Sequence, residues 1–162
     1  MGIIKTLRTE IIRPTQPGLT FYQLRYVLWF HASGNKNDLG IVAVEYDEKN
    51  ENYLTLDGHH RIAIAELYGE SLEAYVAQSK FDLMKQENFP NLSKDALEMM
   101  NLNINWRFSD VLMNVEFFDL CGPRSFKDLR NKYDYMKNLE SALKHFSYDK
   151  TVPKNPPRFS YI

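Results

Sequence analysis

Short apolar runs alternate with polar turns through the first half of the chain, and their order predicts a small α/β unit. Residues 3–12 form the first run, and residues 41–46, 53–56 and 72–77 are further runs of strand length, each bounded by polar residues. Runs of this length and composition predict strands. Residues 47–52 are all charged or amide residues. They predict the turn of a hairpin that joins two of these strands.

Two runs in the same half repeat apolar residues at helical spacing. The first follows Thr20, which is suited to cap a helix. Its stripe ends at His31, which we expect to be a packed or C-terminal helix residue rather than a ligand. The second run, residues 62–68, is stopped by Gly69. The predicted fold class is therefore α/β (α+β), with a β-α-β-β-α-β core over residues 1–78.

The second half of the chain has a different pattern. Residues 79–150 are predicted to form a helical extension packed on the core. Ser93 is suited to cap a helix over residues 94–103. Residues 111–120 are equally compatible with a helix and with a buried strand. The tail, residues 151–162, contains three prolines and is predicted to be extended or disordered.

Ser125 opens the strongest helical pattern of the chain. The apolar residues of this stripe are Phe126, Leu129, Tyr133, Met136, Leu139 or Leu143, and Phe146. The simplest interpretation is a core face that packs on the α/β unit. The alternative is that residues 125–146 form a homodimer or partner surface.

Composition narrows the class of protein. The chain has 162 residues, a net charge of −1 and a pI near 6.4, so it lacks the basic footprint of a general nucleic-acid binder. Cys121 is its single cysteine, which excludes a disulfide framework and leaves a buried thiol or a reactive one. No apolar run reaches the length of a membrane span, and the first residues lack the profile of a signal peptide. We therefore expect a cytoplasmic protein without a membrane partner.

The most informative residues are Asp57-Gly58-His59-His60-Arg61, which lie between a predicted strand and a predicted helix. A helix start presents free backbone N–H groups and the positive end of the helix dipole, and both favour an anion. Gly58 lets a phosphate oxygen approach the backbone, and it can adopt a positive φ. Arg61 can donate two parallel hydrogen bonds, and His60 can donate from its ring. These features predict a phosphate site formed by Gly58, His59, His60 and Arg61.

Asp57 has a different place in this hypothesis, because its carboxylate would repel a bare phosphate. It is predicted to be a magnesium ligand, a base for an incoming hydroxyl group, or a group that orients the histidines. The alternative is that Asp57 caps the helix and that the cationic run is a solvated first turn. Three potential cations at a helix start, however, interact unfavourably with the positive end of its dipole. A bound anion would offset this cost.

A zinc site is a poor interpretation of the same residues. His59 and His60 are adjacent and point about 100° apart on a helix, unlike ligands spaced by four residues. The chain has two further histidines, His31 and His145. It has no serine-hydrolase elbow and no Gly-rich Walker loop.

The run from Leu56 to Ala63, followed by Leu67-Tyr68-Gly69, resembles the ParB/sulfiredoxin superfamily. Members of that superfamily carry a strand, a Gly-x-x-Arg or Gly-x-His-Arg turn and a helix that together hold nucleotide phosphates. The order of elements from about residue 7 to residue 77 also fits, including the Pro/Gln segment at residues 14–17. The resemblance covers a little under half of the chain and does not extend to residues 78–162.

Three branches of the superfamily differ at this turn. Sulfiredoxins place a cysteine directly before the His-Arg pair, where this chain has His59, so sulfinic-acid reductase activity is not expected. Chromosome-partition ParB proteins carry an arginine-rich turn and often a proline where this chain has Gly40. The free serine kinases carry Asp-Gly-His-His-Arg, which residues 57–61 reproduce in full, and they are the most similar branch.

The resemblance also points to a substrate side. Those kinases use a glutamate, after a proline in the loop before the first helix, as the base for the substrate hydroxyl. The corresponding position here is Gln16, and an amide cannot accept that proton. Asp57 or Glu10 would then have to replace it, or the protein binds nucleotide without being a kinase.

The resulting prediction is a nucleotide-binding protein that uses ATP or another nucleotide with magnesium. Its predicted reaction is phosphoryl transfer to a small hydroxyl-bearing substrate, or nucleotide hydrolysis, with Asp57 as the catalytic or magnesium-binding residue. The alternative is a nucleotide-sensing or nucleic-acid-associated interaction module without turnover. DNA binding is disfavoured by the net charge of −1.

Overall fold

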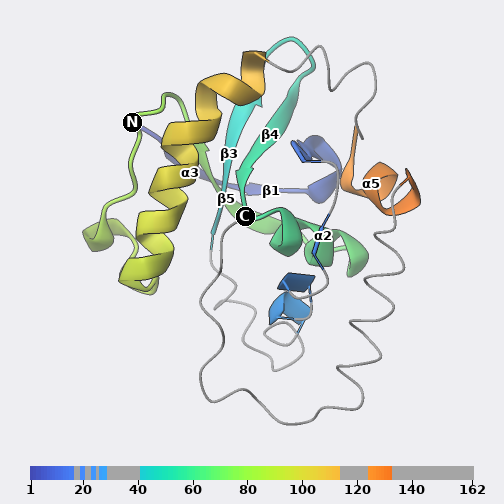
Figure 1. The fold of residues 1–162 in the computed structure, drawn as a ribbon, viewed down its shortest axis with the longest axis horizontal. Coiled ribbons are helices and arrows are strands. Elements are labelled where there is room, and N and C mark those ends of the chain that lie inside the picture. The colour runs from blue at the N-terminus through green and yellow to red at the C-terminus, as the bar shows by residue number, and fades with distance from the viewer. Residues whose placement is uncertain (17–18, 21–22, 25, 29–40, 114–123, 133–162) are drawn as a thin grey trace, which may run out of the picture.

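A five-stranded mixed sheet forms the centre of the computed structural model of the chain (Figure 1). The structure describes residues 1–16, 19–20, 23–24, 26–28, 41–113 and 124–132, with the backbone alone for residues 109–113 and 130–132. The strands, in their order across the sheet, are β1 (Ile3–Leu7), β5 (Leu72–Ala77), β3 (Val42–Asp47), β4 (Asn52–Asp57) and β2 (Ile12–Arg13). The mixed α/β class predicted from the sequence is thus confirmed.

The central strands follow the sequence pattern closely. β3 and β4 pair antiparallel as the predicted hairpin, and β5 runs parallel to β3 on the other side. β1 pairs antiparallel with β5, and β2 pairs parallel with β4. The strands predicted at residues 41–46, 53–56 and 72–77 are all present, because each combines strand composition with a clear polar boundary.

The prediction of one continuous strand over residues 3–12 is wrong. A short 3₁₀ helix, η1 (Thr9–Ile11), separates β1 from β2, and the two strands lie at opposite edges of the sheet. Leu7 and Ile12 are five residues apart, a span of at most about 18 Å. A flat sheet would hold its outer strands about 19 Å apart. The sheet therefore curls, and η1 crosses between its two edges.

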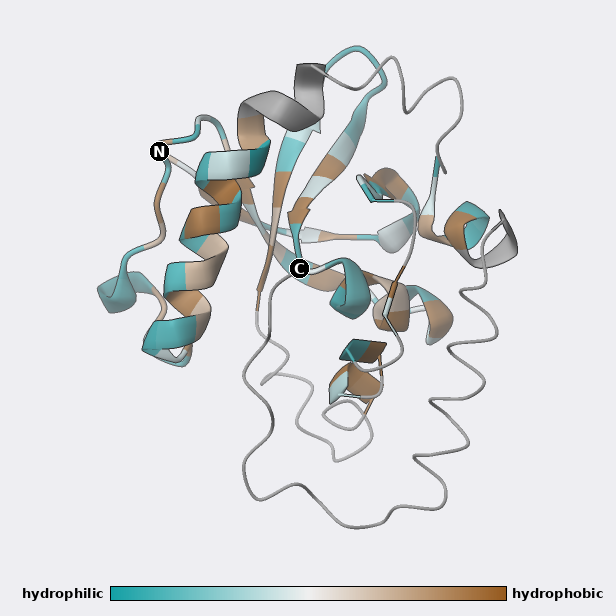
Figure 2. Cartoon of the chain, viewed as in Figure 1, coloured by the Kyte–Doolittle hydropathy of each residue, from teal (hydrophilic) through white to brown (hydrophobic). Residues whose placement is uncertain are grey.

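Each face of the sheet carries its own hydrophobic core. Side chains alternate along a strand, so Val42 and Val44 face one core whereas Ile41 and Ala43 face the other. The first core includes residues of α2 (His59–Leu67), of α5 (Phe126–Lys132) and of the helical residues 23–24 and 26–28. The second core lies under α3 (Lys94–Met113), whose apolar positions alternate with hydrophilic ones along the helix (Figure 2).

The helix predicted at residues 94–103 extends ten residues further, to Met113. The Ser93 hydroxyl caps it, as predicted, by accepting the Ala96 N–H at 3.2 Å. The helix continues because Ile104 and Phe108 repeat the spacing of the buried residues before them. Residues 111–113, which the sequence left open between helix and strand, are helical, and residues 114–120 lie outside the described ranges.

The connection between β5 and α3 is less helical than the pattern of the second half suggested. Residues 78–93 contain one 3₁₀ turn, η3 (Gln86–Asn88), and side chains satisfy much of the remaining backbone. The Asn101 side chain, for example, accepts the Met84 N–H at 2.7 Å and donates to the Met84 carbonyl at 2.9 Å. None of the helices in the described ranges, the 20-residue α3 included, is both long and apolar enough to span a membrane.

The helix predicted after Ser125 begins at Phe126, and the Ser125 hydroxyl accepts the Asp128 N–H at 3.0 Å. Phe126 and Leu129 are fully buried in the first core, which confirms a core face for the described part of this helix. Residues 133–146, the tail after residue 150, His31, Cys121 and His145 all lie outside the described residues. The partner surface proposed at residues 125–146 thus stays a prediction.

One carboxylate is buried without a partner in the sheet. Glu45 on β3 is 1% exposed, and neither of its carboxylate oxygens accepts a hydrogen bond. Its register neighbours are Leu54 on β4 and Ala77 on β5, both members of the second core. Burial, with a smaller effect of Asp47, raises the pKa of Glu45 to about 8.

We predict that this carboxyl group makes the protein less stable as pH rises. Between pH 4.5 and about 8 the folded state keeps the Glu45 proton, whereas the unfolded chain has released it. The free energy of unfolding therefore falls through this window. Glu45→Gln should gain stability over the wild type progressively above pH 4.5, by a few kcal/mol at most, and the gain should level off above about pH 8.

Urea unfolding at several pH values measures this difference. Glu73→Gln, which removes an exposed carboxylate from β5, is the matched control. The prediction is contradicted if Glu45→Gln and the wild type keep a constant difference in unfolding free energy from pH 4 to pH 9.

Candidate functional site

The joint between β4 and α2 is the turn that the sequence singled out. β4 ends at Asp57, Gly58 turns the chain, and α2 begins at His59. Gly58 has a φ of 100°, in the left-handed region that favours glycine. A Cβ at this position would lie 2.6 Å from Cγ1 of Val42, so only glycine fits there without a shift.

Helix α2 begins without a side-chain cap. Its N-cap residue is Gly58, and no side chain bonds to the cap, so Asp57 does not cap the helix as the alternative interpretation required. The Gly58 carbonyl accepts the Ile62 N–H at 2.9 Å, which is the first hydrogen bond of the helix. The earlier N–H groups of a helix have no intrahelical acceptor. The start of α2 thus has the donor geometry that suits an anion.

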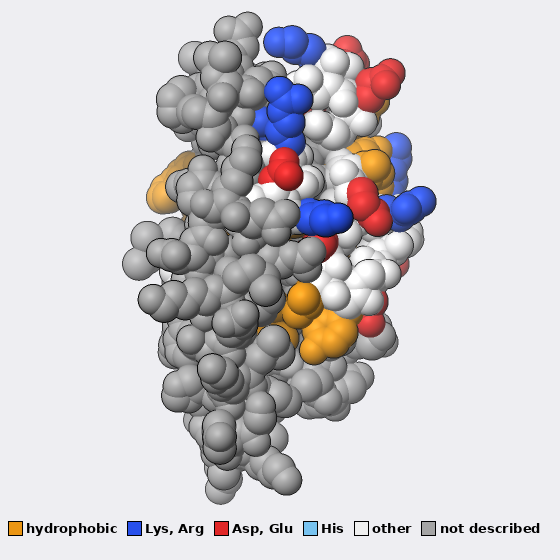
Figure 3. Space-filling model, turned by 90° about the vertical axis from the view of Figure 1, so that its right-hand side faces the viewer, with side chains coloured by type: hydrophobic (Ala, Val, Ile, Leu, Met, Phe, Trp, Pro, Cys, Tyr) orange, Lys and Arg blue, Asp and Glu red, His pale blue; other side chains and the backbone are white. Residues whose placement is uncertain are grey.

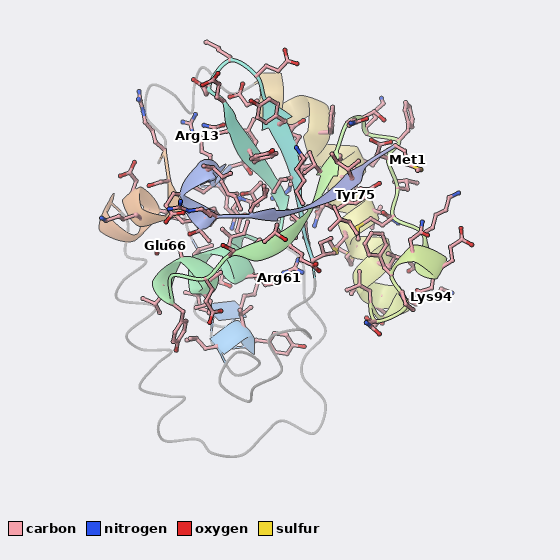
Figure 4. The ribbon with its side chains drawn as sticks, turned by 180° about the vertical axis from the view of Figure 1, so that it is seen from behind. Met1, Arg13, Arg61, Glu66, Tyr75 and Lys94 are labelled. Carbon is pink, nitrogen blue, oxygen red and sulfur yellow. The ribbon has the colours of Figure 1, made fainter. Side chains whose placement is uncertain are left out.

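Asp57 and Arg61 form an ion pair one helical turn apart. The side chains are 17% and 12% exposed, so little water screens the pair. The other Asp57 oxygen, Oδ1, accepts a hydrogen bond from Nδ2 of Asn103 at 2.6 Å. Arg61 also donates from Nη1 to the Ile41 carbonyl at 2.7 Å. The carboxylate and the guanidinium, which were predicted to have separate ligand roles, therefore neutralise each other (Figure 4 labels Arg61 beside the start of α2).

His59 is buried inside the joint. Its Nε2 accepts the Thr15 N–H at 3.0 Å and lies 3.1 Å from the Thr15 hydroxyl, which in turn donates to the Thr55 carbonyl at 2.6 Å. The Phe126 ring of α5 packs 6.1 Å from the His59 ring. Burial, and then the charges of Arg107 and His60, hold the pKa of His59 well below its usual value.

His60 contacts the backbone at Thr20, five residues after the Thr15 contact of His59. Its Nε2 accepts the Thr20 N–H at 3.0 Å. Burial, with a smaller effect of Arg61, lowers the pKa of His60 to about 3. Both rings are therefore neutral at neutral pH, with the proton on Nδ1. The run of three potential cations in the sequence reduces to one permanent cation, Arg61, which is itself paired.

The candidate substrate-side residues have different surroundings. Thr15 and Thr20 flank Gln16 in the chain, so the two histidines hold the ends of its segment at the start of α2. Glu10 on η1 is exposed, and its carboxylate pairs with Arg8 at 3.4 Å. A backbone hydrogen bond and Arg8 lower the pKa of Glu10, which makes it a weaker base.

Helix α3 adds residues to the site that the sequence did not single out. Asn103 contacts Asp57, and Arg107 lies one helical turn further along the same face. The only local signal was the spacing of two polar residues on a helix. Asp57, which Asn103 contacts, and His59, whose pKa Arg107 influences, lie more than 40 residues earlier in the chain, which no local pattern reveals.

Two further features of the described residues concern metal ions and surface charge. No three His, Cys, Asp or Glu side chains among them gather as a metal site. On the face drawn in Figure 3, Lys and Arg side chains lie among Asp and Glu side chains rather than in one basic patch. Each oxygen of the Asp57 carboxylate keeps a second lone pair, so one contact to magnesium is still compatible with its hydrogen bonds.

No protein-family model and no curated protein matches the chain. Among solved structures, it is similar to protein Atu1540 from Agrobacterium tumefaciens, with 19% sequence identity and a TM-score of 0.43. The match covers 94% of this chain and 74% of that one. A likeness at this level assigns neither a family nor a function.

The two glycines that flank α2 give a matched test of the turn geometry. Both have positive φ, 100° at Gly58 and 65° at Gly69, but only Gly58 has neighbours that a Cβ would touch. Gly69→Ala should cost about 1 kcal/mol of unfolding free energy from backbone strain. Gly58→Ala should cost at least about 2 kcal/mol more, because Val42 must also move. Urea unfolding of both variants measures the difference, and equal losses would contradict the tight contact with Val42.

Proposed function

We propose that the β4–α2 joint binds the phosphates of a nucleotide. The observation that carries this proposal is the start of α2, which lies on a left-handed glycine and has no side-chain cap. Such a start offers backbone N–H groups and a positive dipole end to an anion. Gly58 permits the positive φ that directs the chain from β4 into this helix start.

The resemblance to the ParB/sulfiredoxin superfamily supports the same proposal. In that superfamily a strand, a Gly-x-His-Arg turn and a helix hold nucleotide phosphates. Here Gly58, His60 and Arg61 stand at a strand-to-helix joint. The described elements from β3 to β5 follow the order expected from the sequence, whereas η1 divides the expected first strand into β1 and β2. A ParB/sulfiredoxin-like core is therefore part of this proposal.

Phosphoryl transfer is the enzymatic form of the proposal. Magnesium usually binds through one or two carboxylates together with the phosphates of the substrate. Asp57 is the carboxylate that would hold it here. Bound magnesium would neutralise phosphate charge, and Arg61 would stay oriented by its hydrogen bond to the Ile41 carbonyl. The segment around Gln16, which the histidines hold at the turn, would face the hydroxyl-bearing substrate.

A nucleotide-sensing module without turnover is the second candidate, and a specific observation favours it. Gln16 carries an amide in the segment that lies at the turn, and Glu10 pairs with Arg8 on an exposed surface. Neither residue therefore offers an obvious base beside the motif. In this form of the proposal the nucleotide acts only as a ligand.

Calorimetry with ATP, ADP, CTP and GTP, with and without magnesium, tests the proposal. We expect micromolar binding of at least one nucleotide, and phosphorus NMR follows any product. Binding with turnover supports the enzyme, and binding without turnover supports the sensing module. The absence of binding by any of the four nucleotides contradicts the proposed function.

The role of Asp57 can be isolated with Asp57→Asn, which keeps the shape of the side chain and removes its charge. If Asp57 holds magnesium, the variant should lose the effect of magnesium on nucleotide affinity. Without magnesium it should bind ATP several-fold more tightly than the wild type, because a charge that repels phosphate is gone. Glu98→Gln, an exposed carboxylate on α3, is the control. An unchanged effect of magnesium in Asp57→Asn would refute a magnesium contact at this residue.

Gln16→Glu separates the two candidate functions. It supplies the carboxylate that a free-serine-kinase-like site requires, so a non-catalytic relative should gain turnover of about 100-fold or more over the background rate, the range of general base catalysis. Gln23→Glu makes the same substitution beyond the segment that the two histidines hold, and it serves as the control. If the wild type already turns over and Gln16→Glu does not raise its rate, the absence of a carboxylate at residue 16 does not limit catalysis.

A further inference from the structure

The described charges around the turn nearly cancel. Asp57 and Arg61 form a pair whose charges sum to zero, and both side chains are largely buried. His59 and His60 use their Nε2 atoms as acceptors for the Thr15 and Thr20 N–H groups, so each ring is neutral. The five-residue motif by itself therefore attracts an anion only through the α2 dipole and its backbone donors.

Arg107 is a further cation beside these groups, and it comes from α3. Asn103 fixes that face of α3 against the turn through its 2.6 Å hydrogen bond to Asp57. Arg107 follows one helical turn later, which places it next to Asn103 on the helix surface. Its charge lies close enough to His59 to help lower the pKa of that ring.

Among the residues that the structure describes, Arg107 and Arg61 differ in whether a carboxylate pairs with them. No carboxylate among the described residues pairs with Arg107, whereas Arg61 pairs with Asp57 and Arg8 with Glu10. The side chain is neither fully buried nor fully exposed. A half-buried guanidinium without a counter-ion is costly, and an anionic ligand would remove that cost.

We propose that Arg107 is the cation that binds the phosphates of the nucleotide, so that α3 forms the second side of the site opposite the α2 start. This inference rests on the proposed function. In this arrangement Arg107, which lies outside the five-residue motif, supplies the positive charge for the phosphates, because Arg61 is already paired with Asp57. Arg61 then serves to hold the turn in shape through Asp57 and the Ile41 carbonyl.

Nucleotide affinity of Arg107 variants tests the inference. Calorimetry with ATP, and with inorganic pyrophosphate as a probe without a base, should show binding about 10- to 100-fold weaker for Arg107→Gln, the range for a lost charge-assisted contact. Arg107→Lys should lose less, because it keeps the charge but not the two-pronged geometry. Lys94→Gln removes the same charge from the same helix about 20 Å away and is the matched control. Thermal unfolding checks that each variant is folded.

A compensating double variant makes the test sharper. Asp57→Asn removes one negative charge from the site, so Asp57→Asn/Arg107→Gln restores the net charge of the wild type. If Arg107 acts on phosphate through its charge, the double variant should recover about tenfold or more of the affinity that Arg107→Gln loses, measured without magnesium.

The outcomes separate the two proposals. Wild-type binding with a selective loss in Arg107→Gln supports both. Wild-type binding that Arg107→Gln and Lys94→Gln affect equally overturns the assignment of Arg107 and leaves the proposed function standing. The absence of nucleotide and pyrophosphate binding by the wild type overturns both.

Discussion

The carboxylate of Asp57 joins three parts of the fold at one point. One oxygen pairs with Arg61 on α2, and the other accepts a hydrogen bond from Asn103 on α3. Arg61 extends the connection to the Ile41 carbonyl, next to the start of β3. Because α2 belongs to one core and α3 to the other, this small network ties the two faces of the sheet together at the end of β4. The geometry of the candidate site depends on it.

The same network explains why burial changes the chemistry of the motif. Charged groups are costly away from water unless they are paired, so Asp57 and Arg61 pair and the two histidines stay neutral. The histidine rings then act as acceptors for the backbone N–H groups of Thr15 and Thr20. The side chains that were predicted to be phosphate ligands thus stabilise the β4–α2 turn.

These two roles are compatible, because different atoms perform them. The side chains of His59, His60, Asp57 and Arg61 organise the turn, and the backbone at the start of α2 would hold the proposed anion. A net electrostatic attraction for phosphate then requires a positive charge that is not already paired within the turn. Arg107 meets this requirement, since it lies beside the turn without a counter-ion among the described residues.

The local elements of the core were largely determined by the sequence, for reasons that act over a few residues. Strand composition between polar boundaries predicted β3, β4 and β5, and the Ser93 and Ser125 hydroxyls marked the starts of α3 and α5. Gly58 was identified from the sequence as a residue able to adopt a positive φ, and the structure has it at 100°. Such features depend on backbone preferences and hydrogen bonds that a short segment makes with itself.

Only the tertiary structure decided the rest. The break at η1 sends β1 and β2 to opposite edges of the curled sheet, which the apolar run at residues 3–12 does not reveal. Tertiary burial set the charge states of His59, His60 and Glu45, because desolvation depends on what packs around a group. The hydrogen bond of Asn103 to Asp57 and the electrostatic effect of Arg107 on His59 link residues more than 40 positions apart. The sequence by itself located the turn and its backbone geometry, whereas the charges that the turn presents depend on packing between distant segments.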